Sequence, residues 1–246
     1  MRISKITALV IAISITPSIA FAEEAPKNDE IKHKFSIEGG INKTSGNAES
    51  ENFRGELSLI STLGKYENEF QATGNNQNQN GVREEEYYKV ENQLNREISK
   101  MQFVFGKLIY EDDRFAGIDY RASQLVGVGH KFYDDADFKL STKLGVGARQ
   151  TEFIDPTAED EESVLGSVGG DLFWKINENV EFTQSLDLNF TEANTETVSE
   201  TAFKAFMDKN LYLKFSYEVR NNSDVPTGID KTDTQTIFTV GYQFGE

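Results

Sequence analysis

The stretch FKLSTKLGVGA, residues 138–148, alternates between two kinds of side chain along its whole length. One phase holds Phe138, Leu140, Thr142, Leu144, Val146 and Ala148, and the other holds Lys139, Ser141, Lys143, Gly145 and Gly147. Because successive side chains of a β-strand point to opposite faces of the sheet, the pattern predicts a strand with one apolar and one polar face. The apolar face requires a partner, and the candidates are a second sheet, a layer of helices and lipid.

Segments with the same alternation recur along the chain and predict about 12 strands. Their apolar phases run through Phe35–Ile41, Phe53–Leu59, Tyr66–Ala72, Tyr88–Leu94, Met101–Phe105, Tyr120–Phe132, Phe138–Ala148, Val164–Trp174, Val180–Phe190, Thr201–Ala205, Leu211–Val219 and Phe238–Phe244. The segment from Met101 fits poorly, because strict alternation aims Lys107 at the apolar side. A bulge at Gly106 would return Leu108 and Tyr110 to that side.

The connections between these segments alternate in length. Short ones are expected at 64–65, 96–100, 133–137, 177–179 and 208–210, and longer polar ones at 44–48, 74–83, 111–117, 153–162, 191–197 and 221–231. An even-stranded up-and-down barrel with both termini on the short-turn side produces this alternation. The prediction is therefore an all-β, transmembrane, antiparallel β-barrel with short periplasmic turns and longer extracellular loops.

The distribution of charge bears on what covers the apolar face. In the segments 138–148, 180–190, 211–219 and 236–244 the apolar phase holds no charged residue, whereas the other phase holds Lys139, Lys143, Glu181, Asp187, Lys214 and Glu218. Lipid explains this, because a basic side chain at the bilayer midplane costs about 2–4 kcal/mol. A soluble β-sandwich also keeps charges off its inner face and is the alternative fold. The alternating loops favour the membrane barrel.

The first 22 residues resemble a secretory signal peptide. Arg2 and Lys5 precede the apolar run 6–15, and Ala20-Phe21-Ala22 forms a cleavage site with small residues. We expect a cleaved signal peptide at 1–22, a short periplasmic segment at 23–32 and an outer-membrane barrel at 33–246. The exported chain has no cysteine, which excludes disulfides and thiol chemistry, and the formal charge of -16 for the full sequence argues against a nucleic-acid partner.

The stretch YEDDRFAGIDYRASQLVGVGHKF, residues 110–132, resembles the central motif of the salt-induced outer-membrane protein family, also called YdiY-like, whose function is unknown. Thr44-Ser45-Gly46-Asn47 is similar to the opening signature of the same family. The resemblance covers residues 33 to 244. It implies a β-barrel in the outer membrane of a Gram-negative cell envelope and a response to salt. It implies no activity, cofactor or functional residue.

If the apolar phase faces lipid, the other phase lines a lumen. The expected lumen-lining residues are Arg54, Glu56, Glu67, Glu69, Lys89, Glu91, Arg121, Lys139, Lys143, Arg149, Asp171, Glu181, Asp187, Lys214, Glu218 and Arg220. Two functions follow: a narrow porin-like pore for small solutes or ions, or a structural or adhesive barrel whose charges pair and plug the lumen. Gly127, Gly129, Gly145, Gly147 and Gly169 share the lumen phase, and they either make room for long side chains or ease curvature.

An outer-membrane hydrolase is the third possibility, and the sequence offers little for it. Only His33 and His130 are available, and Asp-x-His, His-Glu-x-x-His and Gly-x-Ser-x-Gly do not occur. We therefore expect no enzyme, no metal and no cofactor. The acidic runs 84–86, 112–113 and 155–162 fall in outside loops, as solvated segments or as sites bridged by divalent cations to lipopolysaccharide. The expected partners are outer-membrane lipid, lipopolysaccharide, the barrel-assembly machinery and small solutes or ions.

Overall fold

The computed structural model describes residues 30–45, 50–79, 82–114, 117–155, 157–225 and 230–245. They form β1 (Lys32–Ser45), β2 (Ser50–Leu63), β3 (Tyr66–Gln79), β4 (Val82–Ser99), β5 (Gln102–Asp113), β6 (Ile118–Asp134), β7 (Phe138–Phe153), β8 (Glu161–Asn177), β9 (Val180–Phe190), β10 (Thr195–Phe206), β11 (Leu211–Asn222) and β12 (Thr232–Gly245). The predicted signal peptide and most of the segment 23–32 lie outside the described residues. No helix with the length and apolar character of a membrane span occurs in the described part of the chain.

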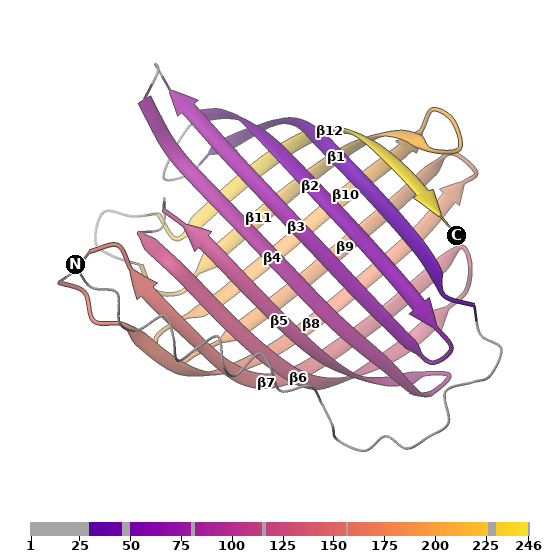
Figure 1. Ribbon diagram of the computed structural model, residues 1–246, viewed down its shortest axis with the longest axis horizontal. Coiled ribbons are helices and arrows are strands. Elements are labelled where there is room, and N and C mark those ends of the chain that lie inside the picture. Colours follow the sequence, from indigo (N-terminus) through magenta and orange to yellow (C-terminus); the bar gives the residue numbers. More distant parts are fainter. Residues whose placement is uncertain are drawn as a thin grey trace. The chain divides into compact units, whose positions relative to one another are not determined.

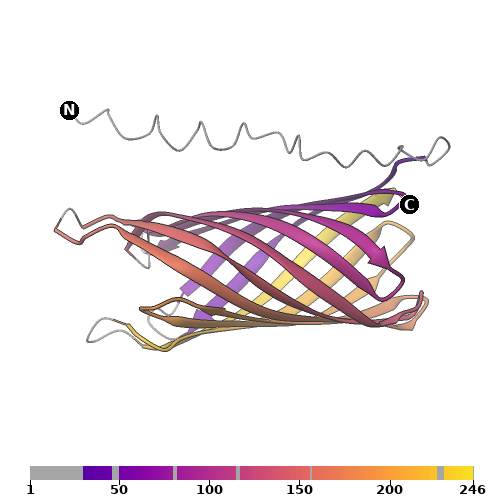
Figure 2. The same cartoon turned by 90° about the horizontal axis from the view of Figure 1, so that it is seen from below.

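Each strand pairs antiparallel with its neighbours in sequence, and β1 pairs with β12 to close a barrel. At this seam Phe35 lies opposite Phe244 and Ile37 opposite Tyr242. Figure 1 shows the yellow β12 beside the indigo β1, and Figure 2 shows the tilted strands from a view turned by 90°. The predicted twelve-stranded antiparallel barrel is confirmed.

The two faces of the barrel differ as the alternation predicts. Leu144 and Val146 on β7 are each 57% exposed, and Val126 on β6 is 64% exposed. Neighbours on the opposite phase are buried, such as Arg149 at 8% and Leu125 at 5%. Apolar side chains thus cover the outside while charged side chains lie inside, which is the arrangement of a barrel whose outer solvent is hydrocarbon.

Strand β5 departs from the sequence prediction. Its pairing with β6 runs without a shift from Gln102 to Glu111, so there is no bulge at Gly106. Phe103 and Phe105, which we assigned to the outer phase, are each only 7% exposed and form an inner cluster with Leu125 and Leu165. We had placed this phase on the outer face because Phe103 and Phe105 are aromatic. The phase continues to Lys107, whose charge correctly indicates the inner face.

The connections also differ from the prediction, mainly at one end of the barrel, although β4 also runs to Ser99 through most of the expected turn 96–100. The short turns lie between β2 and β3, β4 and β5, β6 and β7, β8 and β9, and β10 and β11, at what we call the turn-side end. At the opposite, loop-side end, β3 continues to Gln79 and β4 begins at Val82, so most of the expected loop 74–83 is strand. Residues 111–113 and 195–197, which we also expected in loops, are strand as well. These segments carry polar residues on both faces, so we predicted loops, whereas the structure shows that they extend the strands.

Candidate functional site: the charged lumen

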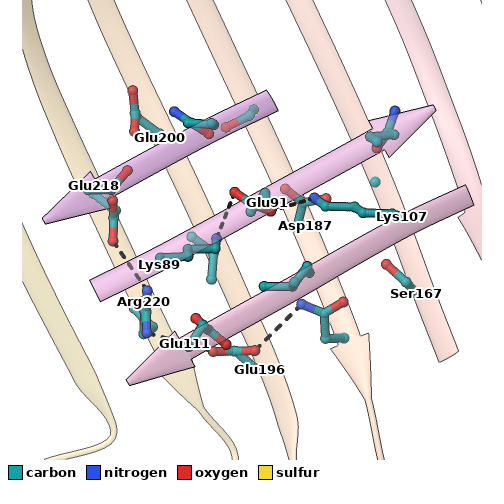
Figure 3. A pocket seen from close by; sticks show the side chains of 18 of the residues that line it. Lys89, Glu91, Lys107, Glu111, Ser167, Asp187, Glu196, Glu200, Glu218 and Arg220 are labelled. Carbon is teal, nitrogen blue, oxygen red and sulfur yellow. Dashed lines mark hydrogen bonds and ion pairs between the residues drawn. The ribbon is translucent and has the colours of Figure 1, made fainter. Parts of the chain in front are cut away.

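The interior of the barrel holds a cavity of about 460 Å³, here called the central cavity. Side chains from β2 to β12 line it, and most of them carry charge or hydrogen-bonding groups (Figure 3). Because inward-facing residues come from nearly every strand around the barrel, the cavity belongs to the lumen and not to a groove between elements.

The structure places the sixteen sequence-predicted residues in three groups. Those that line the central cavity are Arg54, Glu69, Lys89, Glu91, Lys143, Arg149, Asp171, Asp187, Glu218 and Arg220. Glu56, Arg121 and Lys214 form ion pairs with inward-facing residues, and Glu67 accepts a hydrogen bond from Asn95.

The remaining two, Lys139 and Glu181, lie near the turn-side end. Lys139 is opposite Asp134 and Phe173 in the strand register, and Glu181 is opposite Lys204 and Lys175.

Glu91 is the centre of a cluster on the β4–β5 wall. The Lys89 Nζ lies 3.0 Å from Glu91 Oε2, and the Lys107 Nζ lies 2.8 Å from Glu91 Oε1. Figure 3 shows the two lysines converging on this carboxylate from opposite sides. On the β7–β8 wall Lys143 pairs with Asp171 at 2.8 Å.

A second cluster forms around Lys214 and the buried Glu38. The Lys214 Nζ lies 3.3 Å from Glu38, 3.7 Å from Glu200 and 4.0 Å from Glu56. The Tyr212 hydroxyl donates to Glu38 Oε1 at 2.7 Å, and the Thr239 hydroxyl donates to Glu38 Oε2 at 3.1 Å. A buried carboxylate needs such partners, because an unpaired charge away from water is costly.

The loop-side half of the lumen holds a network around Glu196 on β10. Arg149 lies 3.4 Å from this carboxylate, and Arg121 and Arg220 each lie 3.9 Å from it. Arg220 also lies 3.8 Å from Glu218 and 4.0 Å from Asp113 on β5. Side chains from β5, β6, β7, β10 and β11 therefore meet inside the barrel, so this network crosses the lumen.

Two of the predicted lumen glycines make room for aromatic rings. A Cβ atom at Gly129 would overlap the Phe103 ring, and one at Gly127 would overlap the Phe105 ring. At Gly169 an added Cβ would lie 2.8 Å from an oxygen of Asp187. Of the two interpretations of these glycines, the structure supports space for long side chains at these three positions.

Several inward-facing residues escaped the sequence analysis. Glu111 and Glu196 lie in strand segments that we had read as loops, and Lys107 lies on the strand whose phase was wrong. Glu38 was detectable, because it falls between outward-facing residues of the predicted strand Phe35–Ile41, whereas Glu200 directly precedes the predicted segment Thr201–Ala205. Continuing the alternation past Tyr110 would have found Glu111.

The structure brings one histidine beside a serine. His33 Nδ1 lies 2.9 Å from Ser61 Oγ, where β1 and β2 pair near the turn-side end. A nucleophilic dyad needs a third group that orients the histidine. No such acceptor contacts the other ring nitrogen in the described part of the chain. His130 packs edge-on against Phe132. Among the described residues there is also no group of three or more side chains arranged to hold a metal ion.

Solved structures with a similar fold include outer-membrane barrels. The NanC porin aligns with a TM-score of 0.58 at 12% identity, covering 85% of this chain and 98% of that chain. The KdgM porin gives 0.51 at 11% identity over 85% and 99%. The translocator domain of the autotransporter NalP from Neisseria meningitidis gives 0.50 at 8% identity over 86% and 88%. At these identities the likeness concerns the fold alone, and that fold is a porin-like β-barrel.

The chain belongs to the family described as "Protein of unknown function, DUF481", which matches residues 37–244. The "Uncharacterized protein YdiY" of Escherichia coli (strain K12) is 25% identical over 222 residues, which are 87% of this chain and 86% of the relative. The resemblance to the YdiY-like family is thereby confirmed.

Proposed function

We propose that this chain is a channel of the bacterial outer membrane that passes small hydrophilic solutes or ions through a narrow lumen. The observation that supports it best is the central cavity of about 460 Å³, which is lined mainly by polar and charged side chains inside a barrel with an apolar outer surface. Water and hydrated ions enter such a lumen more readily than an apolar one. The porin-like fold agrees with this role.

The proposal includes the partners expected from the sequence. Lipid covers the outer face, lipopolysaccharide surrounds the loop-side end, and the barrel-assembly machinery inserts the chain after removal of its signal peptide. No enzymatic step is part of this function. A link to salt, which the family resemblance implies, would appear as a change in conductance or in expression with ionic strength.

A barrel with a closed lumen is the second candidate, and the network around Glu196 favours it. Arg149, Arg121 and Arg220 reach this carboxylate from different strands. If the network is persistent, it obstructs the lumen and leaves a structural or adhesive barrel.

Planar-bilayer recording separates the two candidates. The full chain, refolded in detergent and added to a bilayer in potassium chloride, should give discrete current steps if it is a channel. Folding is verified independently by the heat-dependent shift of its gel mobility. A correctly folded barrel that gives no current across a range of voltages and salt concentrations contradicts the channel and supports the closed barrel.

A further inference from the structure

We infer that the central cavity conducts cations in preference to anions, and that Asp187 on β9 is the carboxylate that contributes most to this preference. The inference rests on the proposed channel function and specifies its substrate class. Three observations support it: the lining carries more carboxylates than bases, the bases are paired with carboxylates, and Asp187 faces the cavity without such a partner among the described residues.

The lining of the central cavity carries an excess of negative charge. Ten carboxylates line it, compared with six basic side chains, Arg54, Lys89, Lys107, Lys143, Arg149 and Arg220. A narrow passage with low-dielectric walls focuses the field of its lining charges. An excess of carboxylates therefore raises the local concentration of cations and lowers that of anions.

The basic side chains are already engaged by carboxylates. Lys107 and Lys89 lie 2.8 and 3.0 Å from Glu91. Lys143 lies 2.8 Å from Asp171. Arg54 lies 3.4 Å from Glu56, while Arg149 and Arg220 lie within 3.9 Å of Glu196. A permeating anion would have to compete with these carboxylates for each base.

Asp187 differs from the paired carboxylates. Within the described part of the chain its side chain has no hydrogen bond and no ion pair within 4.0 Å, although it lines the central cavity. The bases whose charge acts on it most, Lys107 and Lys143, direct their ammonium groups to Glu91 and Asp171. Its carboxylate lies over Gly169, where the absent side chain leaves space on the β8 wall. Asp187 is thus available to a cation in the passage.

The loop-side end adds an independent source of negative charge. Its described connections hold Asp155, Glu159, Asp160, Glu192, Asp224 and Asp230. Against these six carboxylates they hold only two bases, Arg114 and Lys231. Cations are therefore attracted to this mouth before they meet the lumen, and the effect weakens as salt screens the charges.

The test is the zero-current potential of the refolded chain in a bilayer with a potassium chloride gradient. We expect the sign that indicates permeation of K⁺ over Cl⁻, and a several-fold permeability ratio at low salt. Asp187→Asn should lower this ratio without breaking an ion pair. Asp137→Asn, which removes the same charge from the exposed turn 135–137, is the matched control and should leave the ratio nearly unchanged.

The outcomes separate the two proposals. Current with no cation preference overturns this inference and leaves the channel intact, whereas the absence of current from folded barrels overturns the channel and the inference together. A cation preference that Asp187→Asn does not lower overturns the role of Asp187. A loss of preference in Asp187→Asn but not in Asp137→Asn supports both parts.

Discussion

Asp113 on β5 and Arg220 on β11 approach to 4.0 Å across the interior of the barrel. Strands β6 to β10 separate them in one direction, and β12 and β1 to β4 separate them in the other. They therefore come from opposite walls, and their ion pair spans the lumen. Any solute that passes the loop-side half must move around or displace this contact.

Removing the Arg220 guanidinium should widen the passage. We expect Arg220→Ala to raise single-channel conductance, because it removes the contacts to Asp113, Glu196 and Glu218 together. Recording the variant beside the parent chain measures the change. Lys231→Ala removes one positive charge from a loop and controls for charge alone. Equal conductance of Arg220→Ala and the parent would show that the network does not limit flow.

The aromatic rings over the lumen glycines predict a steric effect on stability. Gly129→Ala should destabilise the barrel by about 1–3 kcal/mol, the usual cost of overpacking, because its Cβ would overlap the Phe103 ring. Urea unfolding in lipid vesicles measures this. Gly106→Ala is the control, since nothing lies within 4 Å of its added Cβ. Adding Phe103→Ala to Gly129→Ala should relieve the clash. Equal stability of the two alanine variants would contradict the packing described here.

The outward position of Leu144 predicts the response to a charge on that face. Leu144→Arg should destabilise the folded barrel in a bilayer by about 2–4 kcal/mol, because the guanidinium would lie in hydrocarbon. Ala136→Arg, in an exposed turn, serves as the control. Folding titrations in vesicles report both values. If Leu144→Arg behaves like the control, lipid does not cover this face.

Asp208 in the turn 207–210 predicts a dependence of stability on pH. Its Oδ1 accepts the backbone N–H groups of Leu211 and Asn210, each at 2.7 Å, which lowers the pKa of this carboxyl. A lowered folded-state pKa gives stability that is complete above the unfolded value of about 3.9 and is lost as the pH falls through the folded value.

The variant Asp208→Asn keeps an acceptor oxygen but does not titrate. We expect its loss of stability below about pH 4 to be smaller than that of the parent chain. The measurement is the unfolding midpoint of the variant and of the parent chain at each pH across this range. Glu178→Gln, in another turn, is the control, because Glu178 accepts no side-chain hydrogen bond among the described residues. Parallel curves for all three chains would exclude the turn as a source of acid sensitivity.

The pair of His33 and Ser61 predicts no catalysis. Because no side chain in the described part of the chain orients the His33 ring, we expect no ester hydrolysis that depends on Ser61. An assay of the detergent-folded chain with a lipid-like ester, compared with Ser61→Ala, measures this. Activity that disappears in Ser61→Ala would reverse the conclusion and establish a hydrolase.

The number of strands and the inward or outward phase of most of them could be predicted, because one face of each strand meets an apolar environment and the other meets the polar lumen. Leu144 and Phe238 show this, since both lie outside among neighbours of the opposite kind. The rule fails where the interior is itself apolar. Phe103 and Phe105 face inward because glycines on β6 leave space for their rings, and no local pattern in β5 carries that information.

The loop-side network was harder to predict than the strands. Glu111, Glu196 and Asp113 lie near strand ends, beyond the residues that alternate between apolar and polar. The alternation therefore does not indicate which of these side chains face inward. Their grouping depends on which strands face each other across the closed barrel. That arrangement follows from strand order and register, which a sequence pattern leaves undetermined.

The seam between β1 and β12 has a consequence for how the molecule is assembled. Phe35 and Phe244 become neighbours only when the two ends of a long chain meet, which is a pairing with a high cost in loop-closure entropy. Until they meet, both margins of the sheet carry backbone N–H and C=O groups that hydrocarbon cannot satisfy. A half-built barrel is therefore a poor intermediate in lipid, and insertion and ring closure should proceed as one cooperative event.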